Sequence, residues 1–128
     1  MSYYKNNEAE NAMAVVASWI SKNPKIKVEY HNGKAVDADI FTGKIRIPKL
    51  ACASGLNEEA LYLLRGQVYH EGKHIDSTKL SKNEWPAGAL FTILNGLEDR
   101  RIEAEGSSEH LGCKMVFNWM SNYYNKRI

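Results

Sequence analysis

The chain is expected to adopt an α+β fold, because amphipathic helical patterns surround a short region that alternates like β-strands. The helical patterns cover residues 8–22, 57–79, 83–105 and 111–124. The strand patterns cover residues 26–30 and 39–48. We expect two or three antiparallel strands in a small sheet that backs one side of the helix at 57–79. A length of 128 residues with 44% hydrophobic residues predicts a single domain, 1–128, with residues 1–7 flexible.

The first helix should end at Asn23-Pro24, since the residue before proline leaves the helical region. Its buried face is predicted to contain Ala12, Val15, Val16, Trp19 and Ile20. After the strand at 26–30, His31 is expected in a surface turn. A hairpin is predicted in which Thr42-Gly43 separates residues 40–41 from residues 44–47. We expect residues 45–48 to form an edge strand, which either is purely structural or pairs with an extended peptide.

The most informative motif is His70-Glu71-Gly72-Lys73-His74, within the predicted helix at 57–79. Two histidines four residues apart lie one turn above the other, so their imidazoles can bind one metal ion from the same side. Imidazole ligands suit zinc, whose catalytic sites keep one position open for water. Glu71 is then placed to accept a proton from that water.

A third zinc ligand is expected on the helix at 83–105, because catalytic zinc sites usually have three protein ligands. Glu98 is the candidate, since a carboxylate in the middle of an apolar helix face needs a partner. That face is predicted to contain Phe91, Leu94, Glu98 and Ile102. Asp99 falls on another side of the helix, so we expect it to support the ligands or to replace Glu98 as the third one.

The segments LRGQVYHEGKHIDS and ILNGLEDRRIEAE together resemble those of gluzincin-type zinc metallopeptidases. They are most similar to the small peptidase-like domain that precedes von Willebrand A domains in cobaltochelatase-T-like proteins. The resemblance spans residues 45–113. It implies a zincin-like fold, a zinc site of His70, His74 and an acidic residue of the second segment, and Glu71 as the catalytic carboxylate. Gly72 and Lys73 depart from the family pattern of an apolar and then a small residue.

The last helix, at 111–124, should follow a break at Gly106-Ser107-Ser108. Its packed side is predicted to contain Val116, Trp119, Met120 and Tyr123. Gluzincins generally use a downstream His or Tyr to stabilise the oxyanion. The resemblance therefore makes His110, Tyr123 and Tyr124 the candidates for that role.

The composition limits the partners. A net charge of +2 does not argue for nucleic acid or an anionic membrane. Cys52 and Cys113 are expected to be reduced in a cytoplasmic protein, although a disulfide or a metal-binding role for Cys113 stays open. The predicted function is zinc-dependent hydrolysis of a peptide or protein substrate. The alternative is a non-catalytic, metal-stabilised module that binds a partner protein or a downstream domain absent from this chain.

Overall fold

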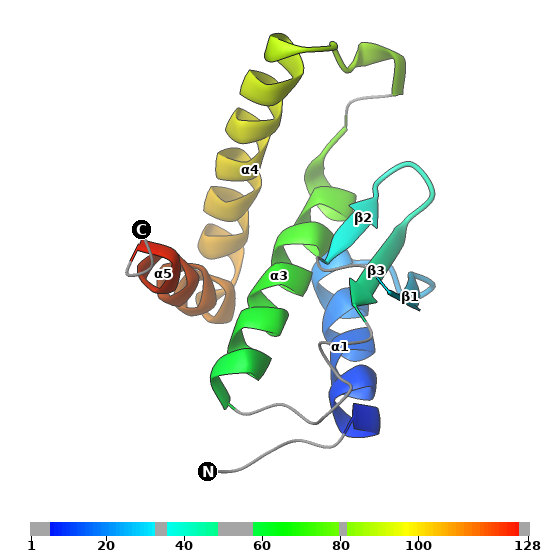
Figure 1. The fold of residues 1–128 in the computed structure, drawn as a ribbon, viewed down its shortest axis with the longest axis vertical. Helices are drawn as coiled ribbons and strands as arrows, with labels where there is room; N and C mark the ends of the chain where they lie inside the picture. Colours follow the sequence, from blue (N-terminus) through cyan, green and yellow to red (C-terminus); the bar gives the residue numbers. More distant parts are fainter. Residues whose placement is uncertain (1–5, 33–35, 49–57, 80–81, 126–128) are drawn as a thin grey trace.

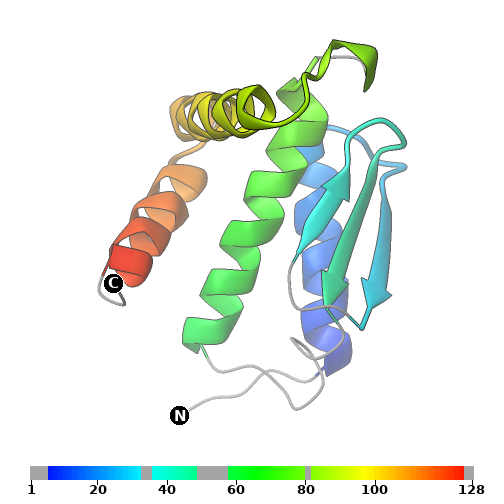
Figure 2. The ribbon, with the colours of Figure 1, turned by 45° about the horizontal axis from the view of Figure 1, so that its top comes forward.

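The computed structural model describes residues 6–32, 36–48, 58–79 and 82–125, and in these ranges it confirms the α+β plan (Figure 1). The elements are α1 (Asn6–Ser21), β1 (Lys27–His31), β2 (Asp37–Asp39), β3 (Lys44–Pro48), α3 (Glu58–Ser77), the 3-10 helix η1 (Lys82–Glu84), α4 (Ala89–Glu109) and α5 (Leu111–Asn125). Helix α3 runs through the middle, with α1 and the sheet on one side and α4 and α5 on the other (Figure 2). No helix in these ranges has the length and hydrophobicity needed to cross a membrane.

The sheet is mixed, which corrects the expected antiparallel sheet. Strand β3 lies between the other two, parallel to β1 and antiparallel to β2. The β2–β3 hairpin is confirmed, but its first strand ends at Asp39 instead of continuing through residues 40–41. The Asp39 carboxylate accepts hydrogen bonds from the backbone N–H groups of Phe41 and Thr42 at 3.0 and 3.2 Å, and Gly43 has φ of 71°. Because of these interactions, residues 40–43 form the turn between the two strands.

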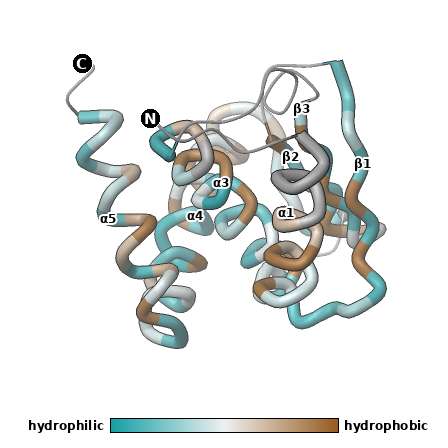
Figure 3. The backbone as a smooth tube through the Cα atoms, turned by 90° about the horizontal axis from the view of Figure 1, so that it is seen from below, coloured by the Kyte–Doolittle hydropathy of each residue, from teal (hydrophilic) through white to brown (hydrophobic). Residues whose placement is uncertain are grey.

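The central position of β3 also corrects the expectation that residues 45–48 form an edge. Ile45 and Ile47 are fully buried against α1 and α3 in the larger part of the core. The other buried members of that cluster are Met13, Ala17, Val36, Leu64 and Val68. Figure 3 shows the hydrophobic stretches of α1, α3 and the neighbouring strands. His31, expected in a turn, is the last residue of β1.

The buried face of α1 differs from the predicted one. Met13, Ala17 and Ile20 are buried, whereas Val15 and Trp19 are 69% and 47% exposed. Residues 12–17 are all apolar, so their pattern is compatible with more than one helix face. Packing against α3 and the sheet selects one of these faces.

Helix α5 completes a second apolar cluster, made of Ile20, Tyr69, Cys113, Val116 and Phe117. The predicted break at residues 106–108 is wrong, since α4 continues to Glu109. A Cβ atom on Gly106 would lie 3.4 Å from a ring carbon of Phe117 and 3.7 Å from Cγ of Lys73. These are ordinary contact distances, so Gly106 is a buried position within α4 and does not end the helix. At its other end α4 begins at Ala89, after η1, and not at Asn83.

Candidate metal centre

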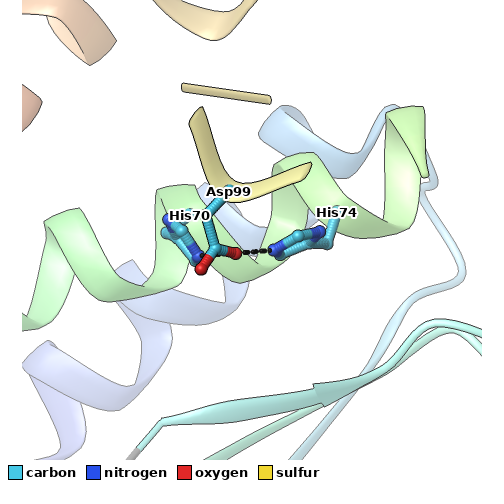
Figure 4. A group of neighbouring side chains, drawn as sticks. All are labelled: His70, His74 and Asp99. Carbon is cyan, nitrogen blue, oxygen red and sulfur yellow. Dashed lines mark hydrogen bonds and ion pairs between the residues drawn. The ribbon is translucent and has the colours of Figure 1, made fainter. Parts of the chain in front are cut away.

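His70 and His74 of α3 face Asp99 of α4 across the interface between these helices (Figure 4). Oδ1 of Asp99 lies 3.1 Å from Nε2 of His70 and 2.7 Å from Nε2 of His74. One potential ligand atom from each of the three residues lies within 4.8 Å of the other two. The predicted juxtaposition of the two histidines with an acidic residue of the second segment is therefore present.

The acidic residue beside the histidines is Asp99, not the first choice, Glu98. The Glu98 carboxylate accepts hydrogen bonds from Thr78 Oγ1, at 3.1 Å, and from the guanidinium of Arg101. The residues of α4 that face the histidines are Asn95, Asp99 and Glu103, spaced four residues apart. Phe91 is 44% exposed, so the apolar residues of this helix do not mark one continuous buried face. The predicted buried face of Phe91, Leu94, Glu98 and Ile102 is wrong, because the first half of α4 contains no buried residue.

The other ring nitrogen of each histidine has its own partner. Nδ1 of His70 lies 2.8 Å from Oε2 of Glu103, and Nδ1 of His74 lies 2.9 Å from Oγ1 of Thr78. Thr78 donates its proton to Glu98, so its hydroxyl oxygen accepts one from His74. In the tautomer with hydrogen on Nδ1, each ring would donate to its own partner and direct the Nε2 lone pair toward Asp99. Glu98 thus supports His74 through Thr78.

The sequence analysis did not identify Glu103 and Thr78 as part of this site. The signal that could have found them is helical spacing, because Glu103 is four residues after Asp99 and Thr78 is four residues after His74. Hydrogen bonds of this kind hold ligand rings in position and are a regular feature of protein metal sites.

Three electron-pair donors therefore converge on one point: two imidazole nitrogens and a carboxylate oxygen. Such an arrangement is repulsive unless a proton or a cation lies between the donors. Burial lowers the pKa of His70, but the hydrogen bond to Glu103 and the nearby carboxylates outweigh burial, so the pKa ends above its ordinary value. Burial lowers the pKa of His74 and the net shift is downward. The carboxylates around His70 thus favour positive charge at that side of the group.

The donor set fits zinc. Two imidazoles and a carboxylate are common zinc ligands, and donors bound at about 2.0–2.1 Å in tetrahedral geometry lie about 3.3 Å apart. The observed separations of 2.7 and 3.1 Å between Asp99 and the two rings require only a small outward movement to reach that value. His70, His74 and Asp99 can therefore hold the ion with one position left for another ligand.

Glu71 lies next to this group and lines the same cleft. Burial raises the pKa of its carboxyl to about 7, with further upward contributions from Asp99 and Asp37 and an opposing one from His70. A carboxylate with a pKa near neutrality is suited to accepting and returning a proton. Its predicted position beside the histidines is observed, and its catalytic role remains a prediction.

The cleft in front of the three donors has a volume of about 600 Å³. Its walls come from the β2–β3 hairpin, from α3 and from the segment that enters α4. The lining residues are Ala38, Asp39, Ile40, Phe41, Arg46, His70, Glu71, His74, Trp85, Phe91, Asn95 and Asp99. The candidate ligands therefore lie in a space large enough for part of a peptide.

Lys73 directs its charge away from the histidines. The side chain is fully buried, and Nζ lies 2.6 Å from Asp76, 3.0 Å from Glu105 and 2.9 Å from Glu109. Burial lowers the pKa of the ammonium, but hydrogen bonds to the three carboxylates raise it more, so the net shift is upward. Lys73 thus links α3 to the last turns of α4 instead of extending toward water.

Gly72 has a packing role of its own. A Cβ atom at this position would lie 2.2 Å from Cγ2 of Ile20, which no real structure tolerates without movement. The glycine allows α1 to lie close against α3. Gly72 and Lys73 thus both make helix contacts on sides of α3 that do not line the cleft.

The downstream His and Tyr candidates do not line the cleft. The ring of His110 lies 4.4 Å from that of Trp19, Tyr123 stacks on Trp119, and Tyr124 accepts a hydrogen bond from Gln67. Cys113 is buried in the second apolar cluster, where burial raises the pKa of its thiol to about 11, and this location gives it no place in the centre. Cys52 and residues 1–5 lie outside the described residues.

No family model, curated protein or solved structure matches this chain. The function must therefore be inferred from the geometry of the site.

Proposed function

We propose that this chain is a zincin-like, zinc-dependent peptidase in which His70, His74 and Asp99 hold the metal and Glu71 is the general base. The observation that carries the proposal is the convergence of two imidazole Nε2 atoms and a carboxylate oxygen at the side of a cleft. A carboxyl group with a pKa of about 7 lines the same cleft. Metal-dependent hydrolysis uses this combination of groups.

When bound, zinc would polarise a substrate carbonyl and lower the pKa of water toward 7. The chain itself supplies the proton transfers: the Glu71 carboxylate accepts a proton from the attacking water and returns it to the leaving amine nitrogen. Glu103 and Thr78 keep the two imidazole rings oriented through their Nδ1–H groups. The carboxylates around Lys73 hold that ammonium away from the reaction.

The substrate of this proposal is an extended peptide. Strand β2 is an edge of the sheet and contributes Ala38 and Asp39 to the cleft. Because an edge strand offers unpaired backbone groups, a peptide can pair with it and lie across the cleft floor. We therefore propose that β2, and not residues 45–48, pairs with the extended peptide.

The rival function is a non-catalytic module that uses the same metal for stability and binds a partner protein. Three large apolar side chains of α4 favour it, because Leu90, Ile93 and Leu97 are 65%, 59% and 61% exposed. Their spacing of three and four residues places them along one side of the helix. Exposed apolar residues gathered on one side of a helix are a feature of interaction surfaces.

Glu71→Gln separates the two functions. The zinc-loaded wild type is expected to cleave members of a peptide library, and Glu71→Gln should reduce the rate by about 100-fold or more without changing zinc content. Glu58→Gln is the matched control, since Glu58 is an exposed acidic residue in the first turn of the same helix. Equal cleavage by wild type and Glu71→Gln would refute the role of Glu71. A zinc-loaded wild type that cleaves no peptide would favour the interaction module.

A further inference from the structure

The cleft beside Glu71 has an aromatic and aliphatic wall built from two separate segments. Ile40 and Phe41 come from the turn between β2 and β3, and Trp85 and Phe91 come from the segment that enters α4. The rings of Trp85 and Phe91 lie 5.5 Å apart at a tilted angle, so they form one surface. His70 and His74 of α3 line the same cleft as both segments.

Two of the wall's aromatic side chains are half exposed. Phe41 and Phe91 are 50% and 44% exposed, although aromatic side chains usually lose most of their accessible area on folding. An exposed aromatic surface inside a cleft gains free energy when an apolar group covers it. The wall therefore favours an apolar occupant.

Two charged residues that line the cleft, Arg46 and Asp39, have partners within the β2–β3 hairpin. Nε of Arg46 lies 2.6 Å from Oδ1 of Asp37, and the Asp39 carboxylate accepts two backbone hydrogen bonds of the turn. An acidic substrate group would meet the carboxyl groups of Asp39, Glu71 and Asp99, which line the cleft together with Arg46. The lining therefore disfavours an acidic occupant, and the apolar surface is the feature that attracts one.

We infer that the cleft selects peptides with a bulky, uncharged, preferably aromatic side chain next to the bond that is cleaved. This inference rests on the proposed function and adds the substrate class. Phe91 and Phe41 are its specificity-determining residues, because they approach the occupant from opposite segments. The site should correspondingly discriminate against small and acidic side chains.

Binding of metal-directed probes tests the inference without requiring turnover. The zinc-loaded chain is titrated with acetohydroxamate, 3-phenylpropanohydroxamate and the monohydroxamate of succinic acid, which share the metal-binding group and differ in the side group. The phenyl probe should bind about 10- to 100-fold more tightly than acetohydroxamate, since burying a phenyl group contributes about this much. The acidic probe should bind no more tightly than acetohydroxamate.

Phe91→Ala should remove most of the difference in affinity between the phenyl probe and acetohydroxamate. Leu97→Ala is the control, because Leu97 is an exposed apolar residue of the same helix outside the cleft lining. Equal binding of the phenyl probe and acetohydroxamate, preference for the acidic probe, or equal effects of the two variants would overturn the inference. Failure of all probes to bind would instead overturn the proposed metal site, and the inference with it.

Discussion

Replacing Asp99 and Glu98 separately tests which carboxylate holds the metal. Asp99→Asn keeps the shape of the side chain but removes the charge that lies 2.7 and 3.1 Å from the two imidazole nitrogens. Glu98→Gln acts two hydrogen bonds away from the metal position, through Thr78 and His74. The two adjacent substitutions therefore differ in whether they remove a ligand or a support.

The structure sets the expected magnitudes. Outer-shell changes typically reduce metal affinity by about 10- to 100-fold, and Glu98→Gln should fall in this range. Asp99→Asn should exceed it, with a loss of more than about 100-fold, or about 2.7 kcal/mol of binding free energy. The wild type should bind about one zinc ion per chain. At a zinc concentration 100 times the Kd, binding should raise the free energy of unfolding by about 2.7 kcal/mol.

Zinc competition with a chelating indicator measures the affinities, and thermal unfolding with and without zinc gives an independent measure. The metal-free unfolding temperatures of both variants show whether the substitutions also disturb the fold. A larger loss of affinity in Glu98→Gln than in Asp99→Asn would refute the assignment of Asp99. Wild-type zinc affinity in Asp99→Asn would refute the three-residue site altogether.

Two further predictions concern stability. Gly72→Ala should lower the free energy of unfolding, measured in urea, by about 1–2 kcal/mol, because the clash with Ile20 costs more than the helix propensity gained. Gly96 has open space around it, so the control Gly96→Ala should raise the free energy of unfolding by up to about 1 kcal/mol. A stabilising Gly72→Ala would contradict the packing argument. Hydrogen bonds from Ser77 and Lys73 lower the pKa of Glu105 to about 2, so its stabilising contribution should be complete above about pH 4.5 and be lost as the pH falls toward 2. The urea midpoint of Glu105→Gln should therefore depend less on pH over this interval than that of the wild type, and parallel pH profiles would argue against the contribution.

The helical periodicities were sufficient to predict four helices, because each spans several turns and repeats its apolar pattern. The spacing of His70 and His74 was also sufficient to put both imidazoles on one side of a helix. Thr42-Gly43 correctly predicted a turn before β3, but the turn begins earlier, at residue 40, where the Asp39 carboxylate accepts backbone hydrogen bonds. Structural features that depend on residues close together in the sequence can therefore be predicted from the sequence.

The position of β3 in the sheet could not be read in this way, because strand order depends on contacts between distant segments. Gly106 resembled a helix break in the sequence, yet it is buried within α4, which continues to Glu109. The buried face of α1 could not be predicted either, because its neighbouring apolar residues are compatible with several buried faces.

The sequence by itself determined the chemistry of the centre: two histidines one helical turn apart, a glutamate beside the first, and two adjacent carboxylates on a later helix. Only the tertiary structure decided between these carboxylates. Adjacent residues point about 100° apart around a helix, so the rotation of α4 against α3 selects which one meets the imidazoles. That rotation depends on the packing of Ile102 and Gly106 and on the Lys73 ion pairs, which bring together residues far apart in the chain. Asp99 meets the rings directly, and Glu98 meets them through Thr78.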